Sequence, residues 1–215
     1  MALVHGAELR PTKIELLAAW LPSRKWYQGE DVTDLTRVAA FRFDDPAGAV
    51  GIETLLVRSG DRPIFQVPLS YRGAPLDGAD EWLIGTLEHS VLGRRWVYDG
   101  SADPVHLAAL TTAIFTGSVQ ADEFIEIDGT LQQRPPSMTV AGSGDADTAP
   151  TIGALKRVGV DDPTVVVTDS VELVIVRRLD GGSGPAGASG PAGARLTGIW
   201  AGQPTAVPLA YATLR

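Results

Sequence analysis

The sequence predicts an α+β fold in which one or two helices pack against a curved antiparallel β-sheet. Short runs rich in β-branched and aromatic residues follow one another, each bounded by Gly, Asp or Pro. Two further segments have the apolar spacing of helices. The regular alternation of strand and helix that builds a parallel sheet is missing, which argues against a Rossmann or flavodoxin arrangement.

Two segments have the apolar spacing of a helix and also residues typical of helix ends. The first is TKIELLAAW, residues 12–20, in which Thr12 and Glu15 have the spacing of a capping box. The second is DPVHLAALTTAIFTG, which begins with Asp103 as the expected N-cap and ends with Gly117. We therefore expect one helix at the start of the chain and one near its middle.

The remaining β-rich runs predict a meander followed by two hairpins. The first run does not alternate cleanly, because Leu35, Val38, Ala40 and Phe43 are its apolar members, and it is expected to contain a bulge. The hairpins are expected to turn at Asp169-Ser170 and at Gly202-Gln203-Pro204. The expected strands lie within 33–45, 48–60, 62–73, 80–90, 94–100, 123–129, 135–144, 163–169, 170–179, 195–202 and 205–214.

The chain has 215 residues and 44% hydrophobic content, enough for one large domain or two small ones. We expect subdomains at residues 1–135 and 150–215, in extensive contact, because the polar stretch 140–150 is short for a free linker. Residues 181–193 have glycine at every third position from 184, but so few triplets cannot stabilise a collagen helix. This stretch is expected to be a surface loop.

The net charge of −8 and the pI of about 4.8 disfavour nucleic acid and anionic membranes as partners. There is no cysteine, which fits a reducing cytoplasm. His5, His89 and His106 lie far apart without metal-ligand spacing, so neither a metal nor a cofactor is expected. No signal peptide and no membrane-spanning apolar run is expected either.

Motifs for common catalytic chemistries are missing. Glu88, His89 and Ser90 are adjacent, but neighbouring strand residues face opposite sides of a sheet and cannot form a dyad. Carboxylates cluster near turns, where they usually cap backbone N–H groups. Neither of the common glycine-rich phosphate-binding patterns occurs. No catalytic residue is therefore assigned.

Aromatic and arginine side chains cluster in the first hundred residues. They allow two interpretations: a small polar site for a ligand or partner, or cation–π packing with a buried ion pair. The candidate binding residues are Arg24, Trp26, Tyr27, His89, Arg94, Arg95, Trp96 and Asp99.

Two stretches resemble the N-terminal cap of actinobacterial maltokinases. The segment WLPSRKWYQGE matches a motif of that family over Arg24-Lys25-Trp26-Tyr27-Gln28-Gly29, with Glu30 where the motif has lysine. The segment VPLSYRGAPLDGADEWLIGTLEHSVLGRRWVYDGSADPVHLAAL is similar to the same cap, so the resemblance covers roughly residues 10–120. It implies a cystatin-like arrangement, a helix held against a curved antiparallel sheet. Short proteins with this cap carry a loose label of α-glucan branching.

The segment VDDPTVVVTDSVELVIVRRLD resembles the next, intermediate region of these kinases. Thr164, Val165, Val166, Asp169, Arg177 and Arg178 keep the family pattern. The family's ATP-binding lysine is replaced by Val174, and its phosphate-contacting loop by Val160–Pro163. Asp161 and Asp162 in this loop would repel a triphosphate. The helical catalytic lobe is not present in this sequence, so kinase activity is not expected.

The resemblance implies a non-catalytic binding or regulatory module that docks on an enzyme of trehalose, maltose or α-glucan metabolism. A second hypothesis is a protein that binds a sugar or sugar phosphate through Trp26, Trp96, Arg94 and Arg95. A third is a glucan-active enzyme, for which Glu88, His89 and Asp99 are the available groups. Self-association remains open for each of them.

Overall fold

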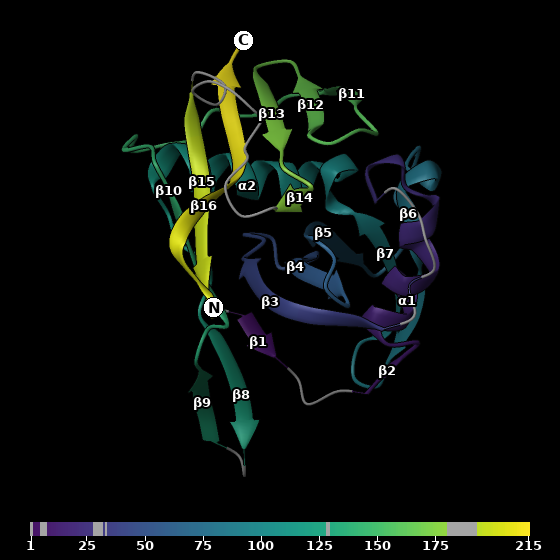
Figure 1. Cartoon of the computed structure of the whole chain (residues 1–215). Helices are drawn as coiled ribbons and strands as arrows, with labels where there is room; N and C mark the ends of the chain where they lie inside the picture. The colour runs from purple at the N-terminus through teal and green to yellow at the C-terminus, as the bar shows by residue number, and fades with distance from the viewer. Residues whose placement is uncertain (1, 5–7, 28–31, 33, 128–129, 180–192) are drawn as a thin grey trace.

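The computed structural model describes residues 2–4, 8–27, 32, 34–127, 130–179 and 193–215. Its dominant feature is a strongly curled antiparallel sheet accompanied by two α-helices and a second antiparallel sheet (Figure 1). The predicted α+β class with a curved antiparallel sheet is confirmed. Residues 28–31 and most of the glycine-rich stretch, 180–192, lie outside the described part of the chain, as do His5 and residues 128–129.

The larger sheet has seven strands, and its main path runs in the order β2-β6-β7-β5-β4-β3, with β14 paired to β5. The predicted bulge in β3 is confirmed, because its register against β4 shifts between Arg37 and Ala39. These strands are β2 (Leu9–Arg10), β3 (Leu35–Phe43), β4 (Gly51–Ser59), β5 (Ile64–Arg72), β6 (Leu83–His89), β7 (Gly93–Asp99) and β14 (Arg178–Leu179).

The second sheet has six strands in the order β10-β15-β16-β13-β12-β11. Both predicted hairpins are confirmed, since β12 pairs with β13 and β15 with β16 in antiparallel register. The second turn lies at Ala201 and Gly202, so Gln203 and Pro204, expected in the turn, begin β16. Its strands are β10 (Met138–Gly142), β11 (Leu155–Val158), β12 (Thr164–Thr168), β13 (Val171–Ile175), β15 (Ala194–Trp200) and β16 (Gln203–Leu214).

A small third sheet has three strands, and its β8–β9 hairpin projects from the body of the molecule as an arm (Figure 1). Its strands β8 (Glu123–Ile127) and β9 (Thr130–Arg134) form an antiparallel hairpin, and β1 (Ala2–Val4) pairs with β8 in parallel. The sequence predicted β8 but neither β1 nor β9. The exposed, polar TLQQR of β9 lacks the apolar alternation that marks a half-buried strand.

Helix α1 (Lys13–Trp20) begins with the predicted capping box. The Thr12 hydroxyl accepts a hydrogen bond from the Glu15 N–H at 3.2 Å, and the Glu15 carboxylate accepts one from the Thr12 N–H at 2.7 Å. After Trp20 the chain continues in two 3₁₀ turns, η1 (Leu21–Ser23) and η2 (Lys25–Tyr27). Pro22 therefore sits inside the first of these turns, directly after the α-helix.

Replacing Thr12 with alanine should lower the free energy of unfolding by about 1 kcal/mol, because one N–H of the first helical turn loses its acceptor. Urea denaturation followed by circular dichroism would measure the change. Thr12→Ser is the matched control, since it keeps the hydroxyl and should stay close to the parent chain. Equal losses for both variants would show that the hydroxyl does not stabilise α1.

Helix α2 (Pro104–Thr116) also has the predicted ends. Asp103 caps its start by accepting a hydrogen bond from the Val105 N–H, and Gly117 follows in the left-handed conformation with φ of 68°. The stretch after β10 closes the helix end, because the Gly144 and Ala146 N–H groups donate to the Ile114 and Phe115 carbonyls. A side chain at Gly142 would overlap the Ala113 carbonyl, so glycine is required there.

The two faces of the seven-stranded sheet are covered by different elements. One face packs against α1 and the 3₁₀ turns through Leu17, Trp26, Leu55 and Val97. On the other face, residues of β3 and β4 form one core with α2 and the six-stranded sheet. This core includes Phe41, Ile52, Leu107, Ile114, Met138, Val166, Leu173, Leu196 and Leu209, so it draws on both residue ranges expected as subdomains.

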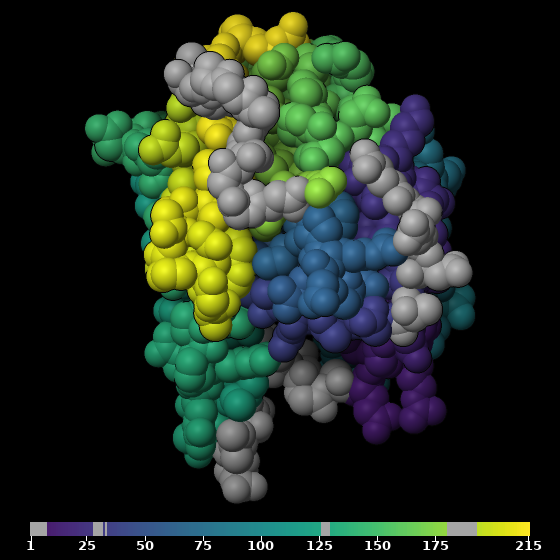
Figure 2. Space-filling model, in the orientation of Figure 1, coloured from purple at the N-terminus to yellow at the C-terminus, as the bar shows by residue number. Residues whose placement is uncertain are grey.

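The two large sheets are joined where β13 ends. The chain leaves the six-stranded sheet after Ile175 and pairs through β14 with β5 of the other sheet. The buried Gln66 side chain donates to the Val176 and Leu209 carbonyls, each at 2.9 Å. In the space-filling view the light green atoms around β14 lie directly against the blue atoms of β4 and β5 (Figure 2).

One expected strand starts later than the sequence predicts. Residues 80–90 were expected to be β-rich throughout, but Asp80–Trp82 form the 3₁₀ turn η3 and the strand begins at Leu83. The Trp82 N–H donates to the Ala79 carbonyl, a local bond that replaces pairing with a neighbouring strand. The short strand β11 was not expected, because Leu155–Val158 alternates too briefly to give a clear signal.

Candidate functional site

A buried arginine lies at the junction between the two large sheets. Arg177 is the second residue after β13 and directly precedes β14, and its side chain has no exposed surface. A buried guanidinium has lost its hydration and needs both a counter-charge and hydrogen-bond acceptors. Its surroundings therefore define the most strongly organised polar site among the described residues.

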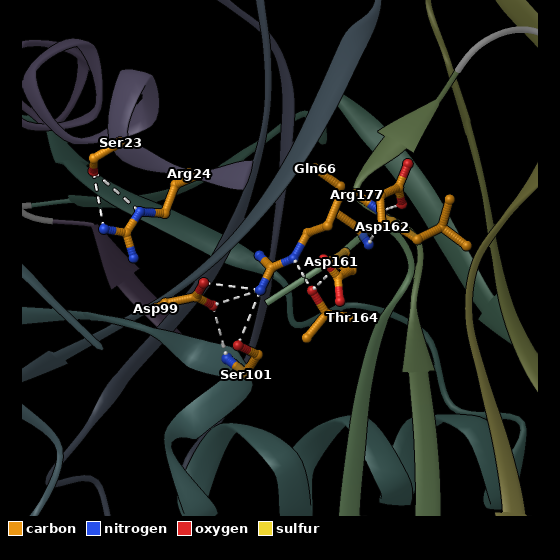
Figure 3. Close-up of polar contacts among 10 residues, drawn as sticks. Ser23, Arg24, Gln66, Asp99, Ser101, Asp161, Asp162, Thr164 and Arg177 are labelled. Carbon is orange, nitrogen blue, oxygen red and sulfur yellow. Dashed lines mark hydrogen bonds and ion pairs between the residues drawn. The ribbon is translucent and has the colours of Figure 1, made fainter. Parts of the chain in front are cut away.

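Three side chains bind the Arg177 guanidinium (Figure 3). Its Nη2 donates to both Asp99 carboxylate oxygens, Oδ2 at 2.8 Å and Oδ1 at 3.1 Å, and to the Ser101 hydroxyl at 2.9 Å. Its Nε donates to the Thr164 hydroxyl at 2.8 Å. Asp99 ends β7, Ser101 lies in the 3₁₀ turn η4 (Gly100–Ala102), and Thr164 begins β12. The arginine thus connects elements of both sheets.

The aromatic cluster beside α1 covers the same guanidinium. The guanidinium carbon lies 4.8 Å from the centre of the Trp26 ring, a cation–π geometry. Trp26 also packs edge-on against Trp20 at 5.8 Å between ring centres. Trp26 and Tyr27 are both buried, and both pack against Phe65 of β5. Both candidate residues therefore contribute to the core, and Trp26 also covers Arg177.

The backbone of Arg177 is held as tightly as its side chain. Its N–H donates to Oδ1 of Asp162 at 2.9 Å, and its carbonyl accepts from the Gln66 N–H at 2.7 Å. The Thr164 hydroxyl in turn donates to the Asp161 carbonyl at 2.9 Å. The loop expected to replace the kinase phosphate-contacting loop is therefore attached to the buried arginine through Asp162 (Figure 3).

Val174, expected from the sequence to replace the family's ATP-binding lysine, lies in β13. Its backbone register pairs it with Val165 of β12 and Tyr211 of β16, and its side chain is half-buried. An aliphatic side chain in this position offers no donor to a phosphate.

Two buried titratable groups in this part of the molecule, His106 and Asp103, have pKa values shifted from the ordinary ones. Burial lowers the pKa of His106 to about 4, outweighing the opposing effect of the nearby carboxylates of Asp103 and Asp99. The ring lies against Gly100, where an added Cβ would come within 2.8 Å of its Cγ. The pKa of Asp103 is lowered, because the Arg72 guanidinium donates to both of its oxygens at 2.6 Å and outweighs the effect of burial.

The remaining candidates lie elsewhere. His89 ends β6, and its Nδ1 accepts hydrogen bonds from the Val91 and Leu92 N–H groups at the β6–β7 turn. It pairs with Gly93, whereas Asp99 lies six residues further along β7. This separation is about 20 Å at ~3.3 Å per residue. His89 and Asp99, two of the groups considered for a glucan-active enzyme, are therefore not brought together.

The arginines expected near Asp99 make other contacts. Exposed Arg94 pairs with Glu88 at 2.8 Å, and Arg95 donates to the Leu92 carbonyl at 2.8 Å. Half-buried Trp96 packs beside the small cluster around Tyr98 and Trp82. Arg24 stacks over Trp20 at 4.8 Å and donates to the Ser23 hydroxyl. The structure thus brings Trp26 and Asp99 together through Arg177, and places His89, Arg94 and Arg95 at the other end of the β6–β7 hairpin.

Among the residues that the structure describes, no group of three or more His, Asp or Glu side chains is arranged to hold a metal. Within the same ranges, neither helix has the length and apolar character needed to cross a bilayer.

A comparison with protein families matches residues 20–103 to the maltokinase N-terminal cap domain. The matched range contains β3 to β7 and ends at Asp103, the N-cap of α2, so it covers most of the curled sheet and includes Asp99 and Trp26. The resemblance drawn from the sequence is thereby confirmed for a cap-like domain. A comparison with curated proteins finds no match.

Proposed function

Because residues 20–103 carry a maltokinase N-terminal cap-like domain, we propose that this chain is a non-catalytic binding module. It docks on an enzyme of maltose, trehalose or α-glucan metabolism in the cytoplasm. The metabolic context is that of maltokinase, after which the cap domain is named. The docking role follows from the chemistry of the region next to the cap.

One observation carries the non-catalytic part of the proposal: Asp162 and Arg177, two charged residues of the expected nucleotide region, are bound to each other, and Arg177 also to Asp99, within the protein itself. The Asp162 carboxylate accepts the Arg177 N–H, and the Arg177 guanidinium is paired with Asp99. Phosphoryl transfer needs cations and N–H donors that face the triphosphate. Here a buried arginine faces a carboxylate, and the loop beside it presents Asp161 and Asp162, both exposed.

The edge of the six-stranded sheet supports a docking role. Strand β11 lies at this edge (Figure 1) and carries the exposed side chains of Lys156 and Arg157. An edge strand presents backbone N–H and C=O groups that can pair with a strand of another protein. We propose that the partner enzyme adds a strand along β11, with acidic side chains facing Arg157.

An assay for phosphoryl transfer from Mg²⁺–ATP to maltose tests the non-catalytic part. The purified chain should form no sugar phosphate, because the loop charges repel the triphosphate and Val174 supplies no donor. Sugar phosphate formed from ATP and maltose would overturn the proposal.

Affinity capture from an actinobacterial lysate tests the docking part. The immobilised chain should retain an enzyme that acts on maltose, trehalose or α-glucan, and the purified pair should bind directly. Arg157→Glu should weaken that binding, whereas Arg58→Glu, an exposed arginine on β4 of the other sheet, is the matched control. Equal binding by both variants would exclude β11 as the docking edge, and failure to retain such an enzyme would count against docking.

A further inference from the structure

A second buried charge lies on the α1 face of the curled sheet, away from Arg177. Glu53 of β4 is only 4% exposed. Its carboxylate accepts from Lys13 Nζ at 2.6 Å and from the Tyr71 hydroxyl at 2.7 Å. Burial would raise the pKa of Glu53, but the charges of Lys13 and Arg42 outweigh it and hold the pKa at about 2. Glu53 is therefore a fixed anion that organises the cations around it.

These groups form one wall of a cavity between α1, the outer edge of β3 and the base of the β8–β9 arm. The cavity has a volume of about 60 Å³. Roughly 10–15 Å³ suffices for one water molecule, so a tetrahedral oxyanion can be accommodated. The lining residues are Lys13, Arg37, Ala40, Arg42, Glu53, Glu123, Arg134, Pro135 and Ser137.

The lining carries an excess of positive charge. Four cationic side chains face two carboxylates, which gives a local balance of +2 in a chain whose net charge is −8. The closest pair, Lys13 with Glu53, is a direct contact, whereas Arg42 lies 3.8 Å from Glu53 and Arg134 lies 3.8 Å from Glu123. Distances of 3.8 Å are too long for direct hydrogen bonds. Both arginines therefore have donors to spare.

A buried N–H donor without a partner indicates that the cavity binds a hydrogen-bond acceptor. The Nε of Arg42 is buried and has no hydrogen-bond partner. Leaving a buried charged donor unpaired costs stability, so such a group in a folded protein calls for a ligand or water. Ser137 cannot serve, because its hydroxyl already donates to the Ala40 carbonyl and accepts from the Ala40 N–H. Exposed Arg37, on the same strand as Arg42, adds a further guanidinium at the mouth.

We propose that this cavity is an anion site for the phosphoryl group of a small phosphate ester. Guanidinium groups match the geometry of phosphate oxygens and bind them with charge-assisted hydrogen bonds. The phosphoryl group accepts from Arg42 and lies between Arg37 and Arg134, while the remainder of the ester stays outside the small cavity. The site is separate from β11 and from the Arg177 network, so it stands independently of the proposed docking role.

Calorimetric titration of the full chain with inorganic phosphate, at constant ionic strength set with chloride, tests the site. We expect saturable binding of one anion. Arg37→Gln and Arg134→Gln should each raise the Kd about tenfold, because each removes one charge-assisted contact. Arg58→Gln, an exposed arginine on β4 outside the cavity, is the matched control and should leave the Kd unchanged. Glucose 1-phosphate in place of phosphate tests whether an ester is accepted.

Several outcomes overturn the proposal. The absence of saturable heat at millimolar phosphate would do so, as would equal Kd values for Arg37→Gln, Arg134→Gln and Arg58→Gln. Binding of phosphate without binding of the ester would restrict the site to the free anion and overturn the ligand class. Circular dichroism of each variant shows whether it is folded. Arg37 is exposed and the Arg134 side chain is 41% exposed, so both variants should remain folded.

Discussion

Replacing Arg177 with alanine should lower the free energy of unfolding by about 3–5 kcal/mol, because it leaves the Asp99 carboxylate buried without a counter-charge. Asp99 is 1% exposed, so water cannot replace the lost guanidinium. The hydroxyls of Ser101 and Thr164 lose their donor in the same step. The Trp26 ring loses its cation–π contact with the guanidinium. We expect the variant to be the least stable of the single substitutions considered.

Urea denaturation followed by tryptophan fluorescence would measure this loss. Arg94→Ala is the matched control, because it breaks an ion pair of similar length whose two side chains are 62% and 58% exposed. Exposed pairs contribute little to stability, so its denaturation midpoint should hardly move. The double variant Arg177→Met with Asp99→Leu should recover part of the loss, since it removes both buried charges. A loss for Arg177→Ala no larger than that for Arg94→Ala would show that the network does not stabilise the fold.

The chain should lose stability as the pH falls from 6.5 to about 4, through His106. The folded pKa of His106 is about 4, below the unfolded value near 6.5, because burial disfavours the charged ring. The unfolded chain therefore binds a proton over this range and the folded chain does not. At about 1.4 kcal/mol per pKa unit, the loss approaches ~3 kcal/mol at the low end of the window.

The charged groups around the ring are consistent with this sign. Asp103 and Asp99 raise the pKa of His106 and Arg177 lowers it, but burial is the largest effect. His106→Gln removes the titrating group, and its free energy of unfolding should depend much less on pH between 6.5 and 4. His89→Gln is the matched control and should keep the parent's dependence, because it leaves His106 in place. Identical pH profiles for His106→Gln and the parent would contradict the assignment.

Local sequence signals predicted much of the fold. The capping box at Thr12 and Glu15, the ends of α2 and the turn between β12 and β13 each depend on residues close together in the chain. Such patterns can be recognised without knowing the tertiary structure. Strand β9 and the 3₁₀ turn at Asp80–Trp82 were not predicted. The exposed TLQQR of β9 lacks apolar alternation, and the turn depends on one local bond, from the Trp82 N–H to the Ala79 carbonyl.

The polar sites depend on contacts between residues far apart in the chain. The sequence therefore predicted the types of residue in the Arg177 site but not all of its members. A combination of indole, arginine and carboxylate was expected, and Trp26 and Asp99 are indeed part of one. The arginine is Arg177, however, which is 78 residues from Asp99 in sequence. Proximity in the sequence could suggest only Arg24, close to Trp26, and Arg94 and Arg95, next to Trp96. The cavity around Glu53 gave no signal, because its lining comes from five segments of the chain.

The side-chain amide of Gln66 has a consequence for anyone who would express the two halves of this chain separately. It belongs to the range 1–135, yet both of its acceptors, the carbonyls of Val176 and Leu209, belong to 150–215. A fragment that stopped before β12 would present this amide, the apolar face of β3 and β4 and the unpaired Asp99 to water. We expect such fragments to aggregate when made alone and to recover a native form only when mixed.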